Sequence, residues 1–210
     1  MTLPRLYVVL DSDVAERFRW SIIDLARACL AGGARLLQVR AKHLAAGPMV
    51  ELCERVVAEA RPANARVIVN DRGDVARLAD AAGVHVGQDD LTPDLVRRVV
   101  GPDLFVGLST HTRDQVARAL ASPIDYLAVG PVFDTATKET GYERVGLDLV
   151  RLAAAEAAPV GMPVVAIGGI TLEQAPSVLE AGAASVAVIS DLLTGGDPEG
   201  RTRAFVARLG

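Results

Sequence analysis

The sequence predicts an α/β fold, a single (β/α)8 barrel, and three observations support that prediction. Short runs rich in Val, Ile and Leu recur along the chain, and each is followed by an Ala-rich amphipathic stretch. This alternation is typical of parallel strands joined by crossover helices. The chain has 210 residues, 50% of them hydrophobic, which suffices for one buried core and lies near the lower size limit of such a barrel. No Gly/Ser-rich or Pro-rich linker divides the chain, so we expect one domain over residues 1–210.

Eight runs have the composition of buried strands, and eight helices are expected to follow them. The runs are Leu6–Leu10, Leu36–Arg40, Val67–Asn70, Gly83–Val86, Leu104–Leu108, Tyr126–Val129, Val164–Ile167 and Val186–Ile189. The helices are expected to begin near Asp13, Pro48, Gly73, Pro93, Arg113, Leu147, Leu172 and Pro198. Thr171 and Gln174 have the spacing of a capping box. Eight β/α units favour a closed barrel over an open doubly wound sheet, which needs fewer strands and usually has a Gly-rich turn after the first one.

Charge and composition argue against several classes of function. Acidic residues outnumber basic ones 26 to 22 without a long block of like charge, which disfavours a general binder of nucleic acid or of anionic membranes. No segment is apolar over the length of a membrane span, and the first residues lack the pattern of a signal peptide, so we expect a cytoplasmic protein. Cys29 and Cys53 lack C-x-x-C spacing and His neighbours at metal-ligand intervals, which predicts buried free thiols.

Barrel enzymes place their chemistry at the carboxyl ends of the strands. The second predicted strand ends in Gln38-Val-Arg40-Ala-Lys42. The two-residue period of a strand directs Gln38, Arg40 and Lys42 toward the barrel mouth, while Leu37 and Val39 face the helices. Two cations held there are costly unless an anion meets them, and diphosphate suits an Arg fork beside a Lys point charge. The alternative is a strand end that is simply solvated.

Carboxylates follow the third and fourth predicted strands. Asn70 and Asp71 end the third, and Gln88, Asp89 and Asp90 follow the fourth. Mg²⁺ is commonly held by one or two carboxylates together with substrate phosphates and water, so Asp71 and Asp90 are candidate ligands, directly or through water. The alternative is structural, with Asp71 capping a helix and an Asx-turn at Asp89 or Asp90.

Hydroxyl and imidazole groups follow the fifth predicted strand. Ser109, Thr110 and His111 are types that donate to a phosphate or contact a heterocycle. One role for His111 is that of a general base, but the sequence offers no partner for it. We therefore expect His111 to be a structural or substrate-contacting residue. We expect His85 in the polar core or at the rim, and His43 at the surface.

The connection after the sixth predicted strand is unusually long. Residues 130–146 show no helical period and carry two hydroxyls and a cation, at Thr135, Thr137 and Lys138. This spacing predicts a site that binds an anion. A long loop at a barrel mouth is also a candidate substrate lid.

The last two predicted strands end in residues that suit a phosphate site. Gly168 and Gly169 precede a helix after the seventh strand, and Ile189 and Ser190 end the eighth. These two loops commonly form the phosphate site of a barrel, because Gly lets backbone N–H groups approach a phosphate closely. The alternative for the paired glycines is a tight turn.

Taken together, seven of these segments resemble the thiamine phosphate synthase family, in order and over nearly the whole chain. They are Gln38–Lys42, Asn70–Asp71, Gly87–Asp90, Ser109–His111, Gly130–Lys138, Ala166–Ile170 and Val188–Ser190. The resemblance implies a Mg²⁺-dependent transferase that joins an aminopyrimidine methyl diphosphate to a thiazole phosphate, through a dissociative pyrimidine methylene cation. The products are thiamine phosphate and diphosphate.

The resemblance also implies roles for individual residues. It assigns the pyrimidine diphosphate to Gln38, Arg40, Lys42, Asn70, Ser109 and Lys138, and Mg²⁺ to Asp71 and Asp90. It assigns the thiazole phosphate to Thr135, Thr137, Gly169, Ile189 and Ser190, with further substrate contacts at Val39, Ala41 and Ala136. The catalytic residues it implies are Arg40, Lys42, Ser109 and Lys138.

Two other functions remain open at this point. The related thiazole tautomerase family shares the barrel and the thiazole-phosphate pocket but generally departs from the pattern at the pyrimidine and metal positions, where this chain has Asn70, Asp71, Asp90 and Lys138. A non-catalytic barrel that binds a phosphorylated ligand would not need a metal pair. The chain itself departs from the family at Gln174, where Asn is frequent, and at the variable residues 139–143. The oligomeric state is open, a homo-oligomer included.

Overall fold

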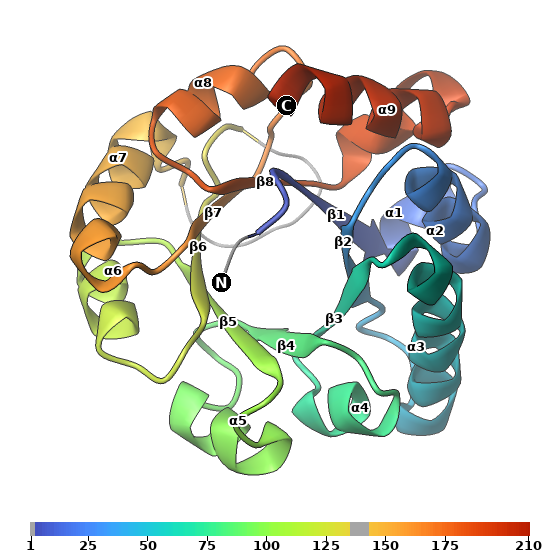
Figure 1. Ribbon diagram of the computed structural model, residues 1–210, viewed down its shortest axis with the longest axis horizontal. Coiled ribbons are helices and arrows are strands. Elements are labelled where there is room, and N and C mark those ends of the chain that lie inside the picture. The colour runs from blue at the N-terminus through green and yellow to red at the C-terminus, as the bar shows by residue number, and fades with distance from the viewer. Residues whose placement is uncertain (1–2, 135–142) are drawn as a thin grey trace.

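The strands close into the predicted barrel in the computed structural model, which describes residues 3–134 and 143–210 (Figure 1). All neighbouring strands are parallel and follow one another in chain order, with β8 pairing back to β1. The strands are β1 (Leu6–Asp11), β2 (Leu36–Arg40), β3 (Arg66–Asn70), β4 (Gly83–Val86), β5 (Phe105–Thr110), β6 (Tyr126–Val129), β7 (Val164–Ile167) and β8 (Ser185–Val188). The predicted fold class is therefore confirmed.

Helices surround the barrel on all sides (Figure 1). They are α1 (Ser12–Arg17), α2 (Ile22–Ala31), α3 (Ala46–Ala60), α4 (Gly73–Leu78), α5 (Pro93–Val100), α6 (Arg113–Leu120), α7 (Gly146–Ala157), α8 (Ala175–Glu180) and α9 (Pro198–Leu209). Short 3-10 segments lie at Arg61–Ala63, Ala158–Val160 and Ser190–Gly196. Within the described ranges, no helix has the length and apolar character needed to cross a membrane.

Some predicted boundaries were wrong by a few residues. The first strand continues to Asp11, because the Asp11 backbone still pairs with Arg40. The fifth strand was predicted at Leu104–Leu108 but continues to Thr110, which pairs with Val129. The eighth begins and ends one residue earlier than predicted, at Ser185–Val188.

Two helices also differ from the prediction. The segment after β1 was expected to form one helix from Asp13, but it divides into α1 and α2, because Ser21 caps a new helix with its side chain. The helix expected from Leu172 begins at Ala175 as α8. The capping-box hydrogen bonds are nevertheless present, from Gln174 N to Thr171 Oγ1 (3.4 Å) and from Thr171 N to Gln174 Oε1 (3.2 Å).

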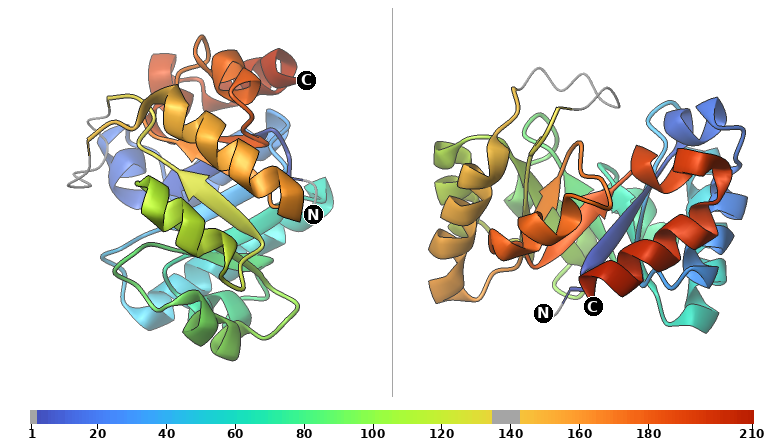
Figure 2. Two further views of the ribbon diagram at one scale, coloured as in Figure 1. Left: turned by 90° about the vertical axis from the view of Figure 1, so that its left-hand side faces the viewer. Right: turned by 90° about the horizontal axis from the view of Figure 1, so that it is seen from above.

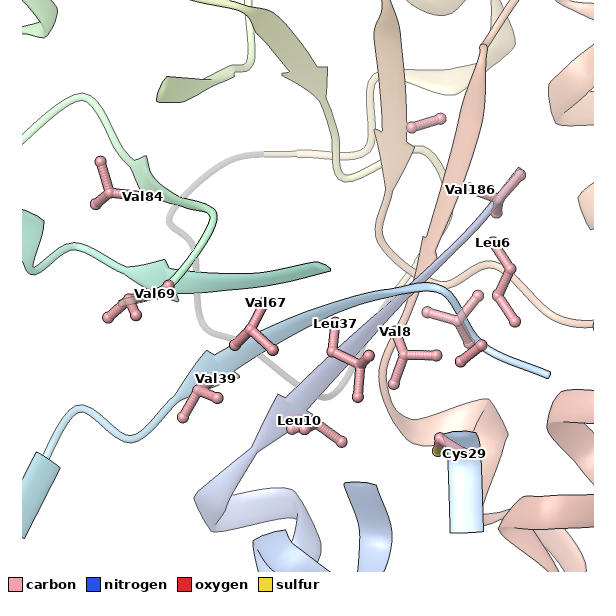
Figure 3. Packing of buried hydrophobic residues seen from close by; sticks show 14 of the residues in the cluster. Leu6, Val8, Leu10, Cys29, Leu37, Val39, Val67, Val69, Val84 and Val186 are labelled. Atoms are coloured by element: carbon pink, nitrogen blue, oxygen red, sulfur yellow. The ribbon is translucent and has the colours of Figure 1, made fainter. Parts of the chain in front are cut away.

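An apolar layer fills the space between the barrel and the helices. Outward-facing strand residues such as Val8, Leu37 and Val39 are fully buried there, as the alternation in the sequence predicts. Figure 3 shows part of this layer, with Cys29 of α2 on the side of β1 that faces the helices. Burial raises the pKa of the Cys29 thiol to about 11 and that of Cys53 to about 12, so both are the unreactive buried thiols that were predicted.

The interior of the barrel has a different composition, because polar side chains accompany the apolar ones. Tyr7 and Tyr126 pack there with Leu36 and Ile68. Gln38 and His85 are also buried, at 6% and 8% exposure. A buried polar group must find a hydrogen-bond partner, so the interior places strict demands on the register of the strands.

Gly107 makes room for two of these polar side chains. In the register of the ladder it lies between His85 of β4 and Tyr126 of β6. Because Gly107 has no side chain, the His85 and Tyr126 rings stack across it, with centroids 5.5 Å apart and planes at 22°. His85 Nδ1 also lies 3.0 Å from the Tyr126 hydroxyl oxygen.

The first described residues and the end of α9 lie on the same face of the barrel, where the strands begin (Figure 2). Arg5 Nη1 donates to the carbonyl oxygen of Leu209 at 3.0 Å, which joins the start of β1 to α9. The carboxyl ends of the strands therefore form the opposite face, which the chain termini leave accessible.

We predict that Gly107→Ala destabilises the fold by about 2 kcal/mol or more, because a methyl group there would overlap the Tyr126 and His85 rings. Gly47→Ala is the matched control, since a Cβ at that position of α3 would meet no described atom within 4 Å. Ala is favoured over Gly in a helix by up to about 1 kcal/mol, so the control should be at least as stable as the parent. Urea unfolding measures both. Parent-like stability of Gly107→Ala would contradict this account.

Candidate active site

Side chains at the carboxyl ends of β1 to β4 form a charged cluster on one side of the barrel mouth. Arg40, at the end of β2, donates from Nη1 to Asp11 Oδ2 of β1. The two residues are direct neighbours in the register, and their side chains are only 15% and 4% exposed. Arg40 is therefore not a solvated strand end, because a carboxylate of this chain already meets it.

Asp11 holds a second set of contacts that the sequence reasoning missed. Its Oδ1 accepts from the backbone N–H groups of Asp13 (3.1 Å) and Val14 (3.0 Å), which caps α1. One carboxylate thus starts a helix and fixes the Arg40 guanidinium. A signal was available, since Asp11 directly follows the first predicted strand and Arg40 ends the second.

Lys42 and Asp71 form the next part of the cluster. Lys42 Nζ lies 3.1 Å from Asp71 Oδ2, with the two side chains 43% and 23% exposed. Asp71 has a left-handed backbone, with φ of 63°, and its N–H donates to the carbonyl oxygen of His85 at 2.8 Å. Asp and Asn tolerate this conformation better than other side chains. The backbone thus turns the Asp71 carboxylate toward Lys42.

Asp90 completes the cluster from the loop after β4. Its Oδ2 accepts from the Gly87 N–H at 2.7 Å. Burial raises the pKa of the Asp90 carboxyl, the Gly87 N–H opposes that shift, and the neighbouring Asp71 carboxylate raises the pKa further. Lys42 partly offsets these effects. Asp71 and Asp90 are therefore close enough to repel each other when both are charged.

The sequence left open purely structural roles for Asp71 and Asp90, and the structure supports such a role only for Asp90. Asp71 is not a helix cap, because among the described residues no side chain accepts a hydrogen bond at the start of α4. Asp90 does hold a local turn through Gly87, so a structural role for it is real. That role occupies one face of its carboxylate and explains neither its closeness to Asp71 nor its raised pKa.

The chemistry of this donor set fits a small divalent cation. Two carboxylates that repel each other across a polar mouth are relieved by a shared positive charge, and hard oxygen donors are what Mg²⁺ prefers. Asn70, at the end of β3, lies beside them and lines a small cavity of about 250 Å³ together with Lys42, Asp71 and Arg72. Asp71 and Asp90 are the residues that could hold the ion.

Gln38 and Ser109 point into the barrel from opposite sides. Gln38 Nε2 donates to the Tyr7 hydroxyl at 2.9 Å, and Ser109 Oγ lies 2.9 Å from His85 Nε2. His85 is thus a polar residue of the core, as predicted. His43 is at the surface, also as predicted, with its side chain 84% exposed.

Thr110 and His111 follow Ser109 in the sequence, and the side chains of both lie within hydrogen-bond distance of backbone carbonyl groups. Thr110 is fully buried and donates from Oγ1 to the Ala128 carbonyl oxygen at 2.9 Å. His111 Nδ1 lies 2.6 Å from the carbonyl oxygen of Gly130. The contacts of Thr110 are structural, and those of His111 agree with the expected structural role.

A cavity of about 400 Å³ opens on the other side of the mouth, at the ends of β7 and β8. Its lining includes Gly168, Gly169, Ile189 and Ser190, which sequence reasoning had brought together. It also includes Thr171 at the start of the α8 capping box. The positions agree with the phosphate-binding loops of other barrels.

Arg17 and Phe18 line the same cavity and were missed by the sequence reasoning. They lie at the end of α1, which directly follows β1, and β1 is the neighbour of β8 in the barrel, so the end of α1 reaches the end of β8. Arg17 adds a cation to a lining that also contains the hydroxyl groups of Thr171 and Ser190 and the carboxylates of Asp134 and Asp191. No motif in the sequence indicates this approach, because the path of the loop depends on packing that no local pattern encodes.

Gly168 and Gly169 combine both of the roles considered for them. Their φ angles are 102° and 66°, and a Cβ on either would overlap the chain at Pro131 or Phe133. They are therefore a tight turn that also packs against the connection after β6. The same two glycines line the cavity, so the tight turn is compatible with the anion site that the sequence predicts.

Several predicted site residues remain to be placed. Val39 points toward the helices, so only its backbone faces the mouth, and Ala41 is buried at 5% exposure. The predictions for Thr135, Ala136, Thr137 and Lys138 fall outside the described residues.

Fold and site together define a barrel enzyme of phosphorylated substrates, with one cationic and carboxylate-rich pocket and one glycine-lined pocket at the same mouth. The family model described as thiamine monophosphate synthase matches residues 6–192. The chain belongs to this family.

Individual relatives agree along the full length. A thiamine-phosphate synthase of Koribacter versatilis is 44% identical over 100% of this chain and 97% of its own length. One from Thermus thermophilus is 44% identical over 99% of this chain and 98% of its own length. Among solved structures, a thiamine phosphate pyrophosphorylase from Pyrococcus furiosus superposes with a TM-score of 0.88 at 30% identity, covering 98% of this chain and 95% of that one.

We predict that Asp11→Asn and Asp11→Ala separate the two roles of Asp11. Asn keeps an oxygen that caps α1 but loses the charge opposite Arg40, so we expect a loss of about 2 kcal/mol, less than for a fully buried pair. Ala loses the cap as well and should be less stable by about a further 1 kcal/mol. Urea unfolding measures both values. Equal stability of the two variants would exclude the capping role, and parent-like stability of both would exclude the ion pair.

Proposed function

We propose that the chain joins an aminopyrimidine methyl diphosphate to a thiazole phosphate, which forms thiamine phosphate and releases diphosphate. The observation that carries this proposal is the division of the mouth into two unlike halves. Arg40 and Lys42 stand beside the carboxylates on one side, and the glycine-lined cavity opens on the other. The relatives named thiamine-phosphate synthase support the same reaction.

The cationic side is the proposed site of the pyrimidine diphosphate. Negative charge gathers on diphosphate as its bond to the pyrimidine methylene breaks, and fixed cations stabilise that charge without having to reorganise. Arg40 is fixed by Asp11, and Lys42 by Asp71. Lys138 is proposed as a third cation, from the segment outside the described residues.

Mg²⁺ is proposed to bind at Asp71 and Asp90. When bound, the ion adds positive charge opposite the leaving diphosphate. The protein's part is to hold the two carboxylates close together, and the Asp71 carboxylate adds to the burial that raises the pKa of Asp90. Lys42 limits this effect, because it pairs with Asp71.

Polar groups from the interior are proposed to hold the aminopyrimidine ring. Gln38, Asn70 and Ser109 surround the end of the barrel at which the ring would sit, and backbone contacts from Val39 and Ala41 adjoin them. An electron-rich aminopyrimidine supports a methylene cation once the diphosphate leaves. The step is therefore dissociative, with the C–O bond breaking ahead of attack.

The glycine-lined cavity is the proposed site of the thiazole phosphate. Gly169, Ile189 and Ser190 would bind the phosphate, with Thr135, Ala136 and Thr137 from the segment outside the described residues. The thiazole nitrogen attacks the methylene carbon with its lone pair and has no proton to lose. The protein therefore supplies position rather than a base, which agrees with the backbone role of His111.

The two alternative functions share only part of this site. A thiazole tautomerase or a regulatory barrel would use the glycine-lined cavity but has no use for a pair of carboxylates beside two fixed cations. The closeness of Asp71 and Asp90 favours the synthase, since their repulsion has a cost that only metal and diphosphate binding would repay. A cytoplasmic location and assembly into a homo-oligomer remain predictions.

Mixing the two substrates with the protein should release diphosphate and form thiamine phosphate only when Mg²⁺ is present. We predict that Asp71→Asn lowers this turnover by about 100-fold or more, because one ligand charge is lost opposite the leaving group. Asn tolerates the left-handed backbone at this position, so the fold should persist. Coupled detection of diphosphate measures the rate, and circular dichroism checks the fold.

The nearby substitution Asp74→Asn provides the control, because Asp74 pairs with Arg72 in α4 and its side chain is 54% exposed. It should keep the parental rate. Parental turnover in Asp71→Asn would contradict the metal site, and the absence of diphosphate release from the unmodified protein would contradict the proposed reaction.

We further predict that Asp90→Asn raises the melting temperature in the absence of Mg²⁺ while it lowers turnover. The pKa of Asp90 is raised in the folded protein, so near neutral pH its charged form destabilises the fold, and a neutral amide relieves that effect. Asn still offers an oxygen to the Gly87 N–H. Asp89→Asn removes the same charge from the exposed neighbour and should change neither property. A lower melting temperature for Asp90→Asn would contradict the repulsion between the carboxylates.

A further inference from the structure

A continuous chain of hydrogen bonds crosses the interior of the barrel below the mouth. Gln38 Nε2 donates to the Tyr7 hydroxyl at 2.9 Å, and the Tyr7 and Tyr126 hydroxyl oxygens are 3.1 Å apart. The Tyr126 hydroxyl lies 3.0 Å from His85 Nδ1, and His85 Nε2 lies 2.9 Å from Ser109 Oγ. These hydrogen bonds therefore join Gln38 and Ser109 of the proposed pyrimidine site. The three residues between them, Tyr7, Tyr126 and His85, were not assigned to that site.

The middle of this chain is sealed from solvent. Tyr7 and Tyr126 are 2% and 1% exposed. Burial is the main cause that raises the pKa of both phenols, so each keeps its hydrogen over the pH range in which proteins are folded. Each hydroxyl therefore has one hydrogen to donate within the chain, which makes the direction of donation the same from one end to the other.

The direction follows from Gln38. Its amide nitrogen donates to the Tyr7 oxygen, so the buried Tyr7 hydrogen finds an acceptor among these residues only if it is directed to the Tyr126 oxygen. The Tyr126 hydrogen is then directed to His85 Nδ1, which has to be an acceptor. The His85 proton is consequently on Nε2 and is donated to Ser109. Ser109 accepts at its oxygen and turns its own hydrogen away from His85.

We propose that Tyr7 and Tyr126 are positioning residues that fix Ser109 as a hydrogen-bond donor toward the pyrimidine diphosphate. The inference rests on the proposed function in one respect, namely that Ser109 contacts this substrate. A serine held as a donor suits an anionic oxygen or an unprotonated ring nitrogen. If each hydrogen bond had the opposite direction, Ser109 would donate to His85 and could contact the substrate only as an acceptor.

The geometry of the ladder supports a dedicated role for the chain. Gly107 leaves the space in which His85 and Tyr126 stack, and it is flanked by these two residues in the register. A purely apolar interior would be simpler to satisfy, because each buried hydroxyl needs a partner. The chain instead carries its polar groups from Gln38 on β2 to Ser109 on β5.

The test is the position of the proton on His85, measured without substrate by long-range ¹⁵N–¹H NMR. The chain has 3 histidines, and His43→Gln and His111→Gln identify the signals of the other two. We expect the His85 proton on Nε2 in the unmodified protein. A proton on Nδ1 would overturn the proposal, whatever the enzyme does with its substrates.

Tyr126→Phe provides the second measurement, because it removes the hydroxyl that His85 Nδ1 faces while it keeps the ring. We expect the His85 proton to redistribute between the two nitrogens and kcat to fall by about tenfold or more, since Ser109 loses its fixed orientation. The KM of the thiazole phosphate should not change, because its proposed site lies at the ends of β7 and β8. An unchanged tautomer together with an unchanged kcat would overturn the proposal.

Thr110→Val is the matched control. It also removes a buried hydroxyl from the strand that carries Ser109, but that hydroxyl donates to the Ala128 carbonyl oxygen outside the chain. It should leave both the His85 tautomer and kcat at parental values, and a fall in kcat equal to that of Tyr126→Phe would overturn the proposal. If Tyr126→Phe does not fold, the tautomer in the unmodified protein decides. An inactive unmodified protein with the His85 proton on Nε2 would contradict the proposed function, while the direction of the hydrogen bonds would still be as proposed.

Discussion

The register of the closed parallel ladder is the constraint on which the site depends. It places Asp11 directly beside Arg40, and it places Gly107 between His85 and Tyr126. A shift by one residue in any strand would turn its polar side chains from the interior into the apolar layer under the helices. Closure of the barrel leaves no edge at which such a shift could be absorbed, so the same ladder that holds the fold also fixes the relative positions of the polar groups.

The charged half of the mouth is organised before any substrate binds. Arg40 and Lys42 each face a carboxylate of the chain itself, so neither cation needs an external anion for its stability. A fixed guanidinium has less rotamer freedom to lose when diphosphate arrives. The repulsion between Asp71 and Asp90 works in the opposite direction, since it favours the arrival of a cation. The proposed binding of metal and diphosphate would therefore bring opposite charges together to a cluster whose own cations are already held in place.

The sequence predicted the fold class and which polar side chains gather at the mouth, because both depend on local periodicity and on the end of each strand. The alternation of side chains along a strand was enough to predict that Leu37 faces the helices and Gln38 the interior. The family resemblance identified Asp71 and Asp90 as candidate metal ligands. Contacts that depend on register or loop path were not predicted. The capping of α1 by the same Asp11 that fixes Arg40, and the approach of Arg17 to the cavity at β8, arise only once the barrel closes.

Stability and chemistry are assigned to different layers of this protein. The apolar layer between strands and helices tolerates no charge and supplies the burial that holds the fold, with Val8 and Leu37 fully enclosed. The interior contributes less apolar burial, because Gln38, Tyr7 and His85 occupy positions that aliphatic side chains could fill. Their hydrogen bonds only offset the desolvation of the groups that make them. The polar interior is therefore better explained by what it does at the mouth, where it ends on Gln38 and Ser109, than by any gain in stability.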